Sequence, residues 1–204
     1  MTMLHRTSDL PPARPTAAVA LAAAMQAVGG GLGWSLVPPL LPDLARDLGV
    51  THAMGGVVWG AAPLGIALAS PFGGAAVDRF GPRRVAATAM VVGALACASR
   101  ALCTGPWSLA ASMLLFGAHV GFVAPSIPKA LAGHVPAARF GRANGVALLS
   151  YTLATAVTVL LARPVLALFA GGWRGAMVLA GVAMLAVAAL WAVAMRDRTL
   201  PMPH

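Results

Sequence analysis

The chain has 204 residues, of which 59% are hydrophobic and only 9% are charged, and its formal net charge is +9. Soluble domains carry charge on about a quarter of their residues, so this composition excludes an ordinary water-soluble globule. The excess of arginine does not indicate a nucleic-acid partner, because the basic residues lie in short links between apolar runs and form no single basic face. The expected surroundings are instead the lipid bilayer.

Six apolar runs are each long enough to cross a bilayer as a helix, which takes about 20 residues. They cover residues 17–41, 54–77, 85–104, 107–132, 143–168 and 174–195. The basic start followed by alanines resembles a secretory signal, but the first apolar run continues to Leu41, which is too long for a signal core. The sequence therefore predicts an all-α membrane protein with a cytoplasmic tail (1–16), a six-helix transmembrane bundle (17–195) and a C-terminal tail (196–204).

The first span contains two candidates for lining a substrate cavity, Gln26 and Trp34. Polar side chains inside a span usually face the protein interior or a water-filled cavity, although Trp34 also suits an anchor at the membrane surface. The pair Gly29 and Gly33 in this span, like Gly117 and Gly121 in the fourth, has the spacing that lets two helices approach closely.

The link after the second span, "GGAAVDRFGPRR" (residues 73–84), holds an acid and three arginines: Asp78, Arg79, Arg83 and Arg84. Gly81 and Pro82 predict a tight turn, and Gly74 permits close helix contact. Cationic side chains suit the inner membrane surface, which explains the arginines. It does not explain the acid, so we expect Asp78 either to pair with the neighbouring arginines or to face the positive end of another helix.

The third span contains Cys97 and Cys103, which lie about 240° apart around a helix and are interpreted as packing residues. In the fourth span, His119 lies near mid-membrane. An imidazole titrates near physiological pH in water and can relay protons or bind substrate, and a neutral packing histidine is the alternative. Lys129, near the inner end, is a further cavity candidate, or it extends to the membrane surface.

The link between the fourth and fifth spans is expected at residues 133–142 and contains Arg139, Gly141 and Arg142. The fifth span then places four polar residues on one helical face. These are Asn144, Tyr151, Thr155 and Thr158. They are candidates for a substrate cavity, or they hold neighbouring helices together. The sixth span has almost no polar side chain.

Basic residues also predict the orientation. With six spans both termini share one side, and that side carries ten basic residues against four on the other. The ten are Arg6, Arg14, Arg79, Arg83, Arg84, Lys129, Arg139, Arg142, Arg196 and Arg198. The positive-inside rule then places both termini in the cytoplasm (N-in/C-in) for a multi-pass protein of the cytoplasmic (inner) membrane. On the other side, Arg100, Arg163 and Arg174 are interpreted as anchors at the membrane surface.

The pattern Gly74-xxx-Asp78-Arg79-x-Gly81-x-Arg83-Arg84 resembles the signature that the major facilitator superfamily of secondary transporters carries between helices 2 and 3. Residues 139–145 resemble the next such link of that family, and residues 36–50 resemble its exit from helix 1. The similarity covers about residues 17–195. It implies one half of a fold in which two six-helix halves enclose a central cavity and rock in alternating access. It also implies that the link of residues 74–84 gates this motion, with Asp78 contacting the opposite half.

The chain differs from the pattern of this family in three ways that bear on its function. The chain supplies only the N-terminal six-helix half, the fourth span lacks the arginine usual in proton-linked members, and the fifth lacks the Gly-Pro-rich signature of drug–proton antiporters. Residues 121–129 loosely resemble transporters of nitrate, cyanate and other small anions, but the second span has no membrane-embedded arginine to hold an anion.

The leading hypothesis is a secondary active transporter of a small solute, such as a symporter, that is completed by homodimerisation or by a partner chain. The alternatives are a truncated remnant and a non-transporting membrane scaffold or assembly protein. The sequence shows no paired carboxylates, nucleophile elbow or phosphate loop, so we expect no enzyme, no catalytic residue, no metal site and no cofactor.

Overall fold

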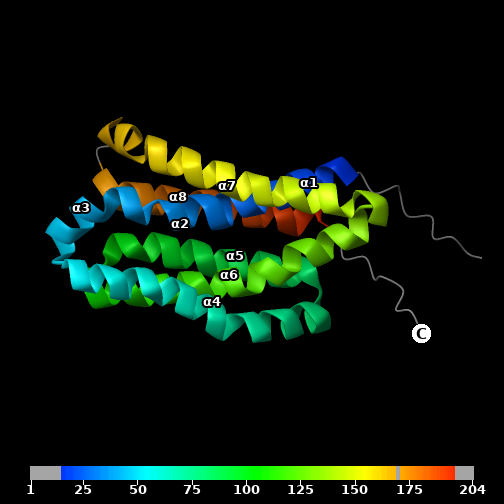
Figure 1. The fold of residues 1–204 in the computed structure, drawn as a ribbon, viewed down its shortest axis with the longest axis horizontal. Coiled ribbons are helices and arrows are strands. Elements are labelled where there is room, and N and C mark those ends of the chain that lie inside the picture. Colours follow the sequence, from blue (N-terminus) through cyan, green and yellow to red (C-terminus); the bar gives the residue numbers. More distant parts are fainter. Residues whose placement is uncertain (1–14, 169–170, 196–204) are drawn as a thin grey trace, which may run out of the picture.

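The structure, a computed structural model, describes residues 15–168 and 171–195, and these form helices joined by short links (Figure 1). Six helical stretches are long and apolar enough to cross a membrane, and they confirm the six predicted spans. Their bounds are Pro15–Leu48, His52–Phe80, Pro82–Leu102, Pro106–His134, Ala137–Leu166 and Gly172–Ala194. Residues 1–14 and 196–204 of the predicted tails lie outside the described residues.

The first span is built from four segments: α1 (Pro15–Ala24), the π-helix η1 (Met25–Leu32), α2 (Gly33–Ser35) and α3 (Val37–Leu48). Pro38 and Pro39 lack the N–H that would continue the helical ladder, which accounts for the interruption at Leu36. The predicted end of the first span at residue 41 is wrong, because the helix continues through Pro42 to Leu48. Leucines four residues apart bury one face of α3, and Gly49 ends it in a left-handed conformation with φ of 66°.

The second and third spans meet in the predicted tight turn. α4 (His52–Phe80) ends at Gly81, whose φ is 83°, and Pro82 begins α5 (Pro82–Ser99), which continues into the short 3-10 turn η2 (Arg100–Leu102). A positive φ favours glycine, and a proline fits the first helical position because its missing N–H would have no partner there.

The fourth span is α6 (Pro106–His134), the fifth is α7 (Ala137–Leu168) and the sixth is α8 (Gly172–Ala194). Only Val135 and Pro136 separate α6 from α7, so the longer link expected at residues 133–142 is wrong. Alanine and arginine favour helix once Pro136 is passed. Arg139, Gly141 and Arg142 therefore lie in the first turns of α7.

The spans run side by side along the longest axis of the molecule (Figure 1). The α4–α5 turn, the α6–α7 link and the ends of the described chain lie at one end, here called the termini side, and the other end is the distal side. The first span packs mainly on the fifth, the second on the fourth and the sixth on the third. If the first, second and third spans exchange places with the fourth, fifth and sixth, the first–fifth contact becomes the fourth–second contact, and the third–sixth contact stays the same. This symmetry indicates an internal three-helix repeat.

Glycines bring α4 and α6 into backbone contact. A methyl group at Gly65 or Gly73 of α4 would overlap the carbonyl oxygen of Leu114 or Gly121, and one at Gly117 would overlap that of Ala62. The close contact expected of Gly117 and Gly121 is confirmed. The one expected of Gly74 is wrong, because a methyl group there meets nothing within 4 Å, and its neighbour Gly73 faces α6 instead.

Candidate functional site

At the termini side, the carboxylate of Asp78 forms an ion pair with Lys129 of α6. The expectation that Asp78 pairs with its neighbouring arginines is wrong, because the last turn of α4 directs it toward α6. Lys129, expected to line a cavity or extend to the surface, joins α6 to α4 here. Both side chains are exposed, 75% for Asp78 and 41% for Lys129, so the pair is accessible from the membrane surface.

The arginines of the same link point in different directions. The Nε of Arg83 donates to the carbonyl oxygen of Ala192 at 2.8 Å, and the indole N–H of Trp191 donates to the carbonyl oxygen of Arg83 at 3.2 Å. These bonds join the start of α5 to the end of α8. Arg79 lies over the Phe80 ring at 5.2 Å from its centroid, and Arg84 is exposed. Together with the Asp78–Lys129 pair, the link therefore holds four spans together at this side, while its gating role stays a prediction.

A buried column of side chains crosses the interior toward the distal side. The Arg100 guanidinium donates to the carbonyl oxygen of Gly33 at 2.9 Å and lies 4.6 Å from the centroid of the Phe116 ring. The Phe116 ring meets the imidazole of His119 edge-on at 4.6 Å, and His119 Nδ1 lies 2.7 Å from the Phe116 carbonyl oxygen. All three side chains are buried.

The interpretation of Arg100 as a surface anchor is wrong, because its side chain is fully buried. Its Nε and Nη2 have no hydrogen-bond partner among the described residues. The sequence did carry a signal for this position. Gly93 and Cys97 precede Arg100 at helical spacing on one small-residue face, and such faces are usually buried.

His119 has the surroundings of a packing residue. A methyl group at Gly93 of α5 would lie 2.5 Å from the imidazole ring, so the absence of a side chain there makes room for it. Its proton-relay role stays a prediction. Cys97 and Cys103 are buried and not bonded to each other, as expected of packing residues.

The polar residues of α7 meet the first span at its π-helix. A methyl group at Gly30 would lie 2.7 Å from the Tyr151 ring and 3.8 Å from Gln26 Oε1, so both side chains border the same point. The hydroxyl of Thr155 is buried there and has no hydrogen-bond partner in the described part of the chain. The structure thus brings together Gln26, Tyr151 and Thr155.

The remaining candidates lie around this group. Thr158 is buried further along α7 toward the distal side, and Asn144 is half-buried near the termini side. Trp34 is half-buried, meets Trp59 of α4 edge-on at 5.4 Å and lies 6.5 Å from Phe116. It is therefore part of an aromatic cluster that joins three spans.

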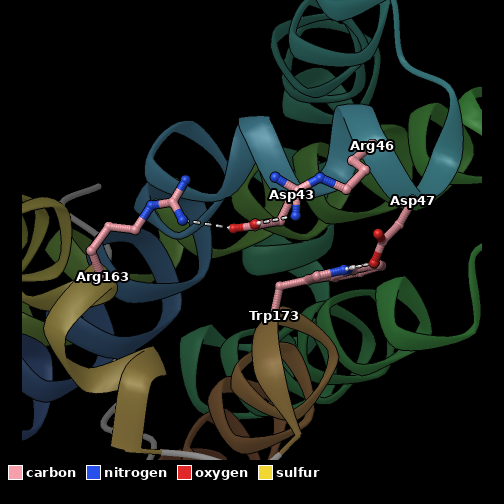
Figure 2. A network of polar contacts seen from close by, with 5 residues as sticks. All are labelled: Asp43, Arg46, Asp47, Arg163 and Trp173. Atoms are coloured by element: carbon pink, nitrogen blue, oxygen red, sulfur yellow. Dashed lines mark hydrogen bonds and ion pairs between the residues drawn. The ribbon is translucent and has the colours of Figure 1, made fainter.

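At the distal side, acids of α3 bind the fifth and sixth spans (Figure 2). Asp43 lies 3.0 Å from the Arg163 guanidinium and 3.8 Å from that of Arg46, and Asp47 accepts a bond of 2.7 Å from the Trp173 indole. The sequence did not predict this network, because Asp43 and Asp47 lie beyond the predicted end of the first span at residue 41.

Arg174 belongs to the same end of the bundle. It donates to the carbonyl oxygen of Ala101 at 2.8 Å and lies 4.3 Å from the Trp173 ring centroid. Arg163 and Arg174, interpreted as surface anchors, therefore bind other spans.

Comparison with known proteins gives one result. The family model described as Major Facilitator Superfamily matches residues 23–203, which include the link of residues 73–84 and every interior polar group described above. No curated protein matches the chain.

Proposed function

The chain belongs to the Major Facilitator Superfamily, and from this premise we propose that it is a half-transporter that moves a small solute across the cytoplasmic membrane by alternating access. In this proposal both termini are cytoplasmic. The second half is another copy of the chain or a six-helix partner. Parallel halves related by an axis along the membrane normal are compatible with either choice.

The main support for a second half is that the spans are buried to different extents. We compare the apolar stretch of 18 residues within each span. Only 22% of this stretch is buried in the second span and 11% in the fifth, against 50% in the third and the fourth. In Figure 1, α4 and α7 lie at opposite edges of the bundle, with α2 and α6 between them. A second half that contacts α4 and α7 would enclose the surface between them, which is the place that alternating access requires for a substrate.

The contact of α7 with the π-helix is the proposed substrate site. A π-helical turn is rare and is often found at functional sites. A buried hydroxyl without a partner is costly, and a hydrogen bond from Thr155 to a bound solute would satisfy it. Gln26 supplies an amide and Tyr151 a phenol at the same contact, so the site suits a small polar solute.

His119 stays the candidate for proton coupling within the same proposal, against the alternative of a packing residue. Its Nδ1 is engaged by the Phe116 carbonyl oxygen, which leaves Nε2 to accept a proton. In uptake driven by a pH gradient, His119→Gln is expected to abolish the dependence on the gradient. Gradient-driven uptake at the wild-type rate would exclude this role.

The test is uptake into liposomes that contain the purified full chain, with a panel of small polar solutes. We expect accumulation of at least one solute, and a loss of about tenfold or more in its uptake for Thr155→Val. Thr152→Val is the matched control, because the Thr152 hydroxyl is exposed and bonds its own helix at Leu148. If an assembled protein moves none of the solutes, the non-transporting scaffold is the better description.

A further inference from the structure

A groove of about 500 Å³ opens between α1 and α7 at the termini side. One wall is the apolar face of α1 and includes Val19 and Ala20. The other is one face of α7, where Arg139, Arg142 and Val146 follow at spacings of three and four residues. The groove lies outside the proposed substrate site and is not part of the link of residues 73–84.

The residues that line the groove change from basic at its mouth to apolar further in. Arg139 and Arg142 are exposed at the mouth, in the first turns of α7. Val146 lies one to two turns further, about 10 Å along the helix axis from Arg139. A basic mouth that leads to an apolar interior matches an anionic headgroup joined to an acyl chain.

No acid of the described residues balances the two arginines. Neither guanidinium has an ion pair or hydrogen bond among the described residues, and no carboxylate lines the groove. Of the acids in the described chain, Asp43 and Asp47 lie at the distal side and Asp78 pairs with Lys129. Within the described chain, the positive charge at the mouth is therefore available to an external anion. The N-terminal end of α7 adds partial charge of the same sign.

We propose that this groove binds one anionic phospholipid, with the phosphate between Arg139 and Arg142 and an acyl chain along Val19, Ala20 and Val146. Basic pockets between helices at the cytoplasmic surface attract anionic headgroups, and the apolar walls bury the chain. The bound lipid would hold the start of α1 against α7. This inference does not depend on transport activity.

The first measurement is native mass spectrometry of the purified full chain with added phosphatidylglycerol or phosphatidylcholine of equal chain length. We expect preferential retention of phosphatidylglycerol. One cation near an anionic surface contributes about fivefold in affinity, so Arg139→Gln/Arg142→Gln should weaken retention about 25-fold. Arg139→Lys/Arg142→Lys keeps the charge and should retain most of the binding.

The matched control is Arg79→Gln/Arg84→Gln, which removes the same charge from the same side but outside the groove. It should change retention less than twofold. Equal retention of both lipids by the wild type would overturn the proposal, and so would an equal loss in the two double glutamine variants, because it would show nonspecific attraction.

A second measurement uses only the wild type, so it does not depend on the folding of any variant. Phosphatidylglycerol with a photoreactive acyl chain should label the peptides that contain Val19 and Val146. Soluble glycerol phosphate at the same concentration should not displace it. Labelling confined to other spans would overturn the site, and displacement by glycerol phosphate would show a site for free phosphate.

Discussion

Two helix contacts that occupy equivalent places in the three-helix repeat are built in opposite ways. Between α4 and α6, glycines of both helices bring backbone against backbone. Between the first span and α7, Gly30 and Gly31 of the π-helix face the side chains of Tyr151 and Ala154, and Gly31 also approaches the Tyr151 carbonyl oxygen. The Thr155 hydroxyl of this α7 face has no hydrogen-bond partner among the described residues.

The difference separates a structural contact from one suited to binding. Close van der Waals packing is a main source of helix association in membranes, so the α4–α6 contact fixes the fold and leaves no room for a solute. The α7 contact is made through side chains and polar groups, and it lies on the least buried span. Substitutions that affect one contact and spare the other can test this division.

The largest effect is expected at Gly117. In Gly117→Ala the new methyl group overlaps the Ala62 carbonyl oxygen. The backbone cannot rotate away as a side chain would, so we expect a loss of about 3 kcal/mol in the free energy of unfolding. Thermal unfolding of the detergent-purified protein measures it.

The control is Gly74→Ala in α4, the helix that packs on α6, where the methyl group meets nothing within 4 Å. Alanine is the better helix former by about 0.5–1 kcal/mol, so this variant should be unchanged or slightly more stable. A loss as large as that of Gly117→Ala would show that the glycines act through helix propensity and not through contact.

A smaller effect is expected at Gly30. In Gly30→Ala the methyl group lies 2.7 Å from the Tyr151 ring, and this side chain can turn away. We expect a loss of about 1 kcal/mol, which Tyr151→Leu should partly relieve in a double-mutant cycle. A cost equal to that of Gly117→Ala would remove the contrast between the two contacts.

Asp78→Asn should lower stability by less than 1 kcal/mol, because exposed ion pairs contribute little. Its effect on uptake should be much larger if the link gates the motion. Lys129→Gln removes the other partner of the ion pair. If the loss of uptake depends on this pair, Lys129→Gln should lower uptake as much as Asp78→Asn does. Full uptake by both variants would exclude the gating role.

The smallest effect on stability is expected for Thr155→Val. This change removes a buried hydroxyl that has no partner among the described residues, so unfolding should be unchanged or slightly less favourable. A marked destabilisation would show that the hydroxyl is bonded in the protein and would weaken the proposed substrate site.

The sequence predicts what depends on local composition. Apolar length located the six spans, and Gly81 followed by Pro82 located the α4–α5 turn. The helical course of residues 42–48 was not predicted, because proline and three charges resemble a link. The buried leucines of α3 become informative only when the helices they contact are known.

The partners of charged groups could not be predicted for a related reason. Asp78 binds Lys129, Arg83 binds Ala192 and Asp47 binds Trp173, and each pair is separated by many residues along the chain. Hydropathy shows that a residue lies near the end of a span, but not which neighbour it faces. Arg100 is the clearest example, since its guanidinium lies inside the bundle and not at the surface.

The central claim is that α4 and α7 contact a second half. It is tested most directly by cysteine cross-linking in membranes with Leu68→Cys on α4 and Leu153→Cys on α7 in the same chain, where both native side chains are exposed. Val182→Cys on α8 is the control, and the native cysteines are buried. We predict oxidative cross-links to a second polypeptide through the α4 and α7 positions and none through α8. No cross-link, or equal cross-linking from all three positions, would contradict the claim.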